Sequence, residues 1–173
     1  MIILLNGSIN AGKTTASKAL CRLLPQTAHV EVDSLRDFIA WMPLEESIPI
    51  NIQTALAVTK IFASHGLNVV FSYPLRPEDY EYLARELVAL SVPVFCFTLN
   101  PGLEIELQNR GTRELTDWER ERIKYHFETK LATPEFGETI NNAGQTPDET
   151  AQEILRRIQS ASVETNAAVV KLP

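Results

Sequence analysis

One run of residues near the N-terminus, positions 7–14, carries the clearest chemical signal and reads GSINAGKT. Its spacing matches G-x-x-x-x-G-K-[ST], the Walker A pattern, in which glycines let successive backbone N–H groups point at phosphate oxygens. A match by accident is expected in about 1% of chains of this length or fewer. The side chain of Lys13 would face the β- and γ-phosphates, and the Thr14 hydroxyl would ligate Mg²⁺. The residues expected to hold the nucleotide are Gly7, Asn10, Ala11, Gly12, Lys13, Thr14 and Thr15.

Two carboxylates, Glu31 and Asp33, stand two residues apart where a second predicted strand ends. Ligands of open α/β sheets bind at the carboxyl ends of the strands, so both are candidates for chemistry. We expect Asp33 to orient or deprotonate an attacking hydroxyl, and Glu31 to hold a metal-bound water. Asp33 is alternatively the N-cap of a helix starting near Ser34, and a structural role stays open for Glu31.

Two arginines could bind an anionic group on the acceptor. Arg36 lies about one turn after Asp33, and Arg76 follows the third predicted strand and Tyr73. The guanidinium fork suits carboxylate and phosphate oxygens. The predicted acceptor site therefore comprises Asp33, Arg36, Tyr73 and Arg76, although each arginine alone is also compatible with a plain surface position.

Apolar runs alternate with amphipathic runs along the chain, which predicts a parallel sheet covered by helices on both faces. The expected strands cover residues 2–5, 29–33, 68–73, 93–99 and 138–142. The expected helices cover residues 12–24, a segment from about 34, 50–65, 77–90, a short segment to about 109, and two segments that begin at capping boxes at Thr116 and Thr146. Pro43 and Pro49 are expected to break the chain, and residues 161–173 are expected to form a tail.

Composition restricts the function classes. The 173 residues suit one domain, expected over 1–160, and the net charge is -6, with 16 Lys and Arg against 22 Asp and Glu. This balance argues against nucleic-acid or membrane partners, which need a basic face. Cys21 and Cys96 follow no metal-like spacing, and no signal peptide is visible, so we expect a reduced, cytoplasmic protein, either monomer or homodimer.

Several of these segments together resemble a known group of proteins. MIILLNG with AGKT, followed about twenty residues later by VDSL at 32–35, looks like chloramphenicol phosphotransferase and, more generally, the shikimate-kinase and nucleotide-kinase group of P-loop kinases. Tunicamycin-resistance proteins share the same general layout. The resemblance implies a three-layer α/β fold with a five-stranded parallel sheet in the order 2-3-1-4-5, and it implies that Asp33 is the general base.

The third predicted strand departs from that group. Many of these kinases carry an acidic residue at its end, where this chain has Ser72. Either Asp33 and Glu31 do the acidic work, or Ser72 contacts a metal-bound water.

The resemblance also implies a lid over residues 110–130. Arg110 and Arg113 would close over ATP and stabilise charge on the transferred phosphoryl group, with Gly111 as a hinge. Arg120 and Arg122 are alternatively part of a solvated helix, because they alternate with glutamates. The loop 142–147 is expected beside the adenine ring.

The expected function is an ATP- and Mg²⁺-dependent phosphotransferase with a small-molecule alcohol as acceptor. The D-x-x-G and N-K-x-D elements of GTPases are absent from the sequence. Two alternatives stay open: a nucleoside or nucleotide kinase, and a non-catalytic nucleotide-binding regulator.

Overall fold

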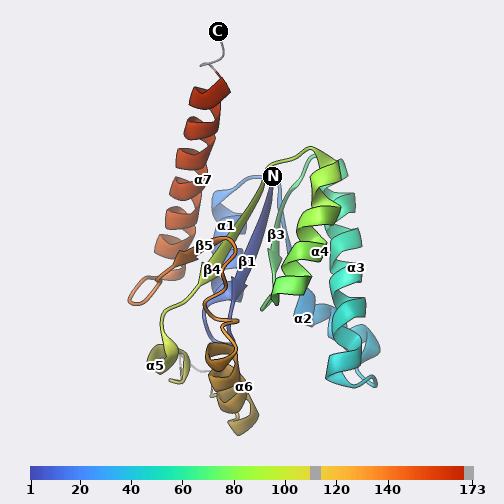
Figure 1. Ribbon diagram of the computed structural model, residues 1–173, viewed down its shortest axis with the longest axis vertical. Coiled ribbons are helices and arrows are strands. Elements are labelled where there is room, and N and C mark those ends of the chain that lie inside the picture. The colour runs from blue at the N-terminus through green and yellow to red at the C-terminus, as the bar shows by residue number, and fades with distance from the viewer. Residues whose placement is uncertain (110–113, 170–173) are drawn as a thin grey trace.

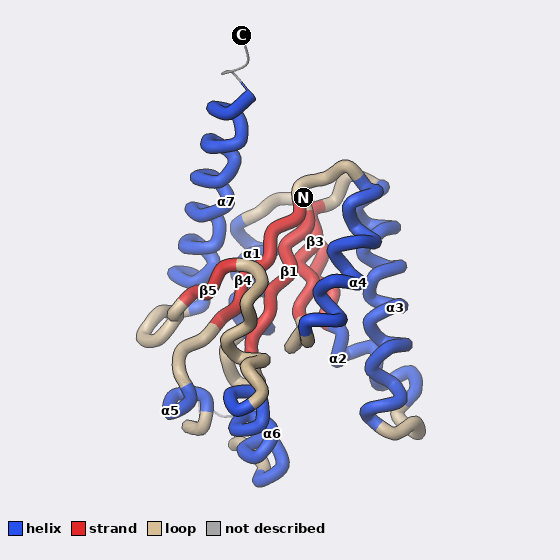
Figure 2. Tube along the Cα trace, in the orientation of Figure 1, coloured by secondary structure: helices blue, strands red, loops and turns tan. Residues whose placement is uncertain are grey.

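A parallel sheet of five strands forms the centre of the protein (Figures 1 and 2). The structure is a computed structural model that describes residues 1–109 and 114–169, with side chains described as far as residue 161. The strands lie in the order β2-β3-β1-β4-β5 and every neighbouring pair is parallel, which confirms the predicted fold class. Their bounds are β1 Ile2–Gly7, β2 Thr27–Glu31, β3 Asn68–Ser72, β4 Val94–Leu99 and β5 Glu138–Ile140.

Helices cover both faces of the sheet, as Figure 1 shows. Helices α1 and α7 pack on one face, and α3 and α4 pack on the other. The bounds are α1 Lys13–Leu23, α2 Val32–Leu35, α3 Leu44–Ser64, α4 Pro77–Leu87, α5 Leu103–Glu106, α6 Asp117–Glu128 and α7 Pro147–Val169, with 3₁₀ turns η1 at Arg36–Ile39 and η2 at Val88–Leu90. Among the described residues, no helix combines the length and apolar character needed to cross a membrane.

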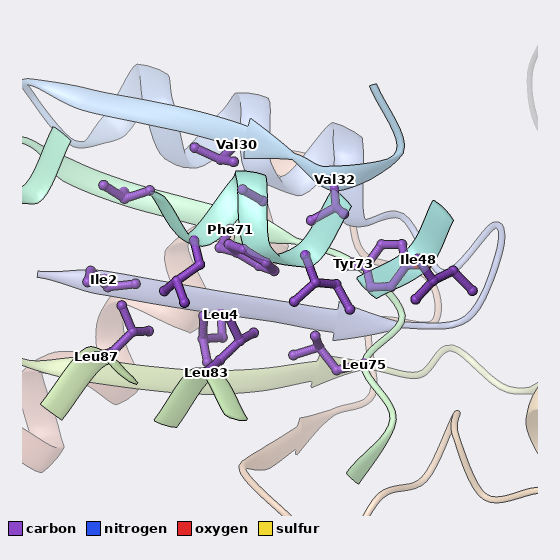
Figure 3. Close-up of a cluster of buried hydrophobic side chains, with 14 residues drawn as sticks. Ile2, Leu4, Val30, Val32, Ile48, Phe71, Tyr73, Leu75, Leu83 and Leu87 are labelled. Carbon is purple, nitrogen blue, oxygen red and sulfur yellow. The ribbon is translucent and has the colours of Figure 1, made fainter. Parts of the chain in front are cut away.

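Alternation along β1 divides its side chains between two cores. Ile2 and Leu4 join the cluster under α3 and α4, whereas Ile3 and Leu5 join the cluster under α1 and α7. Figure 3 shows the first cluster, in which Leu83 of α4 lies against Leu4. Because β1 is buried on both faces, the loop that follows it has a rigid base.

Several helix boundaries differ from the sequence-based expectation. Helix α3 begins at Leu44, so Pro49 lies inside it rather than breaking the chain; the ring is exposed, and the buried face, including Ile48 and Ile52, compensates for one missing backbone hydrogen bond. Helix α7 continues to Val169 through part of the expected tail, in keeping with the helix propensity of its alanines. Helix α2 begins at Val32, two residues earlier than expected.

Both predicted capping boxes are present. Thr116 Oγ1 accepts from the N–H of Glu119, and the Glu119 carboxylate accepts from the N–H of Thr116. The same reciprocal pair joins Thr146 and Glu149. These two local patterns therefore determine where α6 and α7 begin.

Gly137, just before β5, offers a test of the fold. Its φ is +69°, and a Cβ there would lie 2.7 Å from the carbonyl oxygen of Cys96. Gly144 has a similar φ of +73° with nothing within 4 Å, so it is a control for backbone strain alone. We expect Gly144→Ala to lower the free energy of unfolding by about 1–2 kcal/mol, and Gly137→Ala to lower it by about 1–3 kcal/mol more, because the added methyl overlaps backbone. Urea unfolding measures both, and equal losses would contradict the close approach.

Candidate phosphate-transfer site

The glycine-rich loop lies between β1 and α1, at the carboxyl end of the sheet. Gly7 fits only as glycine, since a Cβ would lie 2.7 Å from the carbonyl oxygen of Leu99. Gly12 has a φ of +96° and immediately precedes α1. The Lys13 ammonium donates to the carbonyl oxygens of Gly7 and Ser8, at 2.9 Å each, so it lies over the loop. This place is suited to a phosphate group, because it combines a positive charge, the N-terminus of a helix and a turn built on glycines.

Side chains from distant segments hold this loop in shape. Asn10 donates through Nδ2 to the carbonyl oxygens of Glu106 and Gln108, at 2.8 and 2.9 Å. Asn142 donates through Nδ2 to the carbonyl oxygen of Ala11 at 3.0 Å. The predicted nucleotide contact of Asn10 would therefore come from its backbone, because its side chain faces α5. The 142–147 loop, which was predicted to border the base, adjoins the phosphate loop at Asn142.

The predicted metal ligands Thr14 and Glu31 are brought together. The Thr14 hydroxyl donates to Glu31 Oε1. Thr15 instead turns its hydroxyl back onto the carbonyl oxygen of Gly12, at 2.9 Å. A hydroxyl and a carboxylate are hard oxygen donors, which Mg²⁺ prefers, and Mg²⁺ needs only one or two protein groups besides phosphate and water. The pair thus fits Mg²⁺, and no group of three or more His, Cys, Asp or Glu side chains suited to a metal occurs within residues 1–109 and 114–161.

Ser72, at the end of β3, has a different partner. Its Oγ lies 2.8 Å from Nε2 of His29, and the side chain is buried. In the sheet register Ser72 lies opposite Glu31. The structure therefore pairs Thr14 with Glu31 and pairs Ser72 with His29.

Asp33 lies in the first turn of α2, because β2 ends at Glu31. The N-cap of α2 is Glu31, so the capping alternative for Asp33 does not hold. The carboxylate is open to solvent on its cleft side, yet the surrounding protein desolvates it and raises its pKa. Glu31 raises the pKa further, whereas Lys13 and Arg36 oppose the increase. A carboxyl with a raised pKa near the lysine of the glycine-rich loop is a candidate for proton transfer.

A cleft of about 730 Å³ opens beside Asp33 and contains the whole predicted acceptor site. Tyr73 is buried at its base, where burial first and then the charge of Asp33 raise the pKa of its hydroxyl, so that it stays protonated. The cleft is lined by Ile9, Asp33, Arg36, Leu44, Glu45, Ile48, Tyr73, Pro74, Arg76, Trp118, Glu119, Arg122, Tyr125, His126 and Leu131.

The two predicted acceptor arginines differ in what they contact. Arg36 donates to the hydroxyl of Ser47 at 2.8 Å and to the carbonyl of Met42 at 3.4 Å, both neutral acceptors. Arg76 donates through Nε and Nη2 to the buried carboxylate of Asp79, at 2.9 and 3.0 Å. Since Asp79 compensates the charge of Arg76 at the start of α4, Arg76 is a weaker anion ligand than the sequence predicts.

One wall of the cleft comes from α6. This helix was predicted from the sequence, but its cleft-facing residues were not among the predicted acceptor residues. Trp118, Arg122, Tyr125 and His126 are spaced so that they share one helical face. Arg122 pairs across the cleft with Glu45 of α3, at 3.4 Å. The spacing i, i+4, i+7, i+8 is the signal that could have identified this wall.

Helix α6 lies within the predicted lid, residues 110–130. Arg110, Gly111 and Arg113 lie outside the described residues. Arg120 donates to the carbonyl of Leu107 and to Oδ1 of Asn109, so it holds the chain after α5. Its position supports a structural role rather than a phosphate contact.

Comparisons with known proteins identify the fold. No family model matches the chain, and no curated protein matches it in sequence. Among solved structures, shikimate kinase from Aquifex aeolicus has a TM-score of 0.62 at 16% identity, with 94% of this chain and 99% of that chain covered. APS kinase from Mycobacterium tuberculosis in complex with AMPPNP and APS scores 0.64 at 14% identity, covering 91% and 96%. The tunicamycin resistance protein of Deinococcus radiodurans scores 0.60 at 17% identity, covering 91% and 94%.

These neighbours agree with the predicted resemblance to small P-loop kinases. Identities this low establish a shared fold and leave the substrate open. The chain therefore has the five-stranded α/β fold of the P-loop kinases.

Proposed function

We propose that the protein transfers the γ-phosphoryl group of ATP to a hydroxyl of a small molecule bound in the cleft. One observation carries this proposal: Asp33 lines the acceptor cleft and is also close enough to Lys13 for the lysine charge to influence its pKa. A base that faces both an acceptor pocket and a phosphate loop is the arrangement that phosphoryl transfer requires.

Each residue of the site has a distinct task in this proposal. The amides of the loop and Lys13 bind the phosphates and neutralise charge that develops during transfer. Thr14 and Glu31 would hold Mg²⁺, which would supply positive charge to offset that of the phosphates. Asp33 accepts the proton of the acceptor hydroxyl, and the O–P bond to the acceptor forms as the bond to the ADP oxygen breaks. Tyr73, protonated at the base of the cleft, orients the acceptor by hydrogen bonding.

The cleft favours an acceptor of low charge. Acidic and basic side chains balance in the lining, with Asp33, Glu45 and Glu119 against Arg36, Arg76 and Arg122. Asp79 already compensates Arg76, and Glu45 pairs with Arg122. Apolar side chains provide much of the remaining wall. A hydroxyl compound with an apolar body and at most one acidic group, held by Arg36, fits better than a nucleotide with its phosphate.

A nucleoside is the second candidate acceptor. The exposed rings of Trp118 and Tyr125 face the same cleft and offer a surface on which a base can stack. A nucleoside carries no phosphate, so it needs no additional positive charge in the cleft.

An acceptor screen scored by ADP release tests the proposal. Purified protein is mixed with Mg·ATP and with apolar alcohols, nucleosides or nucleotides, and Lys13→Ala is the blank. We expect ADP release above the blank with an apolar alcohol or a nucleoside. Release with nucleotides alone would contradict the proposed acceptor class. Tight ATP binding without ADP release for any acceptor would instead favour the non-catalytic regulator.

A further inference from the structure

A buried histidine near the end of α6 contacts the phosphate loop directly. His126 is 3% exposed, and its Nδ1 lies 3.1 Å from Oγ of Ser8. The two residues are 118 positions apart in the chain. The proposed reaction assigns no task to either side chain.

Ser8 occupies a central place in the loop. Its carbonyl oxygen accepts from the Lys13 ammonium at 2.9 Å and from the N–H of Ala11 at 3.3 Å. Ser8 therefore contacts, through its carbonyl, the lysine that the proposed function assigns to the phosphates and, through its hydroxyl, the imidazole of His126.

The surroundings keep the imidazole neutral. Burial lowers the pKa of His126 to about 4, and the nearby charges of Arg122 and Lys13 add to the effect. A neutral ring can pair with a hydroxyl as donor or acceptor without repelling the lysine. The contact therefore persists at neutral pH.

The helix that carries His126 also forms the acceptor wall. Trp118, Arg122 and Tyr125 line the cleft from the same face of α6, and the carbonyl oxygen of His126 accepts from the N–H of Ala132 as the chain leaves the helix. The backbone bond fixes the end of α6, and the Ser8 contact joins that end to the phosphate loop.

We infer that His126 is a positioning residue that couples the phosphate loop to the α6 wall of the acceptor cleft through Ser8. Nucleotide binding at the loop then shifts α6, and the shift sets the distance between the acceptor hydroxyl and the transferred phosphoryl group. The inference rests on the proposed function, because it presupposes that the loop binds a nucleotide.

The two tryptophans of the chain make this coupling measurable. Trp41 lies in the turn before α3 and is 80% exposed, whereas Trp118 lines the cleft from α6. In a Trp41→Phe background, fluorescence reports on Trp118 alone. We expect saturating Mg·AMPPNP to change this fluorescence, while calorimetry measures nucleotide binding independently.

Removal of either partner should reduce the signal. In the Trp41→Phe background, His126→Ala and Ser8→Ala should each lose at least half of the fluorescence change at saturating nucleotide, and still bind it. Ser8→Ala leaves the buried histidine in place, so it tests the contact even where His126→Ala fails to fold. His126→Asn should restore most of the Trp118 fluorescence change, because the side-chain amide of asparagine can take the place of the histidine Nδ1 beside Ser8.

A second His–Ser pair, in which Ser72 is buried and His29 is half-buried, is the control. His29→Ala removes the contact between His29 and Ser72, which has similar chemistry and joins β2 to β3. It should keep the full Trp118 response at saturation. A full Trp118 response in both His126→Ala and Ser8→Ala would overturn the coupling, and so would an equal loss in His29→Ala. Either result would leave the proposed function standing. Absence of calorimetric binding in the Trp41→Phe parent would overturn the proposed function, and with it the coupling.

Discussion

Replacement of Lys13 by alanine is expected to lower the rate of phosphoryl transfer about 100- to 1,000-fold. The ammonium lies on the carbonyl oxygens of Gly7 and Ser8, which places its charge at the mouth of the loop. In water such a charge contributes little, but a loop that excludes water strengthens its interaction with charge developing on the phosphoryl group. The measurement is ADP release under saturating Mg·ATP with an acceptor identified by the screen.

Lys18 provides the control for this prediction. It lies on α1 and is exposed, so Lys18→Ala removes an equal charge a little more than one turn from the loop. Lys18→Ala should retain nearly full activity, and thermal unfolding should show that Lys13→Ala keeps its fold. Full phosphoryl transfer by a folded Lys13→Ala protein would show that the loop is not the phosphate site.

The second large effect is expected for Asp33→Asn. Loss of a positioned general base typically costs about 10²- to 10⁴-fold in turnover. Asparagine has nearly the same shape, so it keeps the packing of α2 and removes only the ability to accept a proton. The affinity for Mg·ATP should therefore change little by calorimetry while kcat falls. An unchanged kcat would return Asp33 to a structural role.

The pH dependence gives an independent check. Desolvation by the surrounding protein raises the pKa of Asp33, so the carboxyl becomes protonated at a higher pH than an ordinary aspartate does. Because only the ionised form accepts a proton, kcat should fall as the pH is lowered through this raised pKa. Asp33→Asn should lack that decline. Asp37→Asn, in the exposed η1 turn, is the control and should keep both kcat and the pH profile.

Features that depend on neighbouring residues could be predicted from the sequence. The phosphate loop needs glycines, a lysine and a threonine within eight positions, and the two capping boxes need partners three residues apart. Backbone geometry brings such residues together wherever the segment lies. The sheet order followed from the resemblance that those local motifs supported.

Side-chain partners from distant segments could not be predicted in the same way. Arg76 has a suitable type and place for an anion ligand, but its fork meets Asp79 because Pro77 starts a helix there. Glu31 and Asp33 were both expected at the end of the second strand, yet β2 ends at Glu31 and Asp33 lies in α2.

The candidate phosphate loop could therefore be predicted from the sequence alone, because its glycines, its lysine and its threonine lie on one short segment of the chain. The acceptor cleft was decided by the tertiary structure. Its walls come from α2, α3 and α6, and the link between its far wall and the phosphate loop joins His126 to Ser8. Such contacts exist only after the sheet and helices have packed, since no local spacing relates residues that far apart.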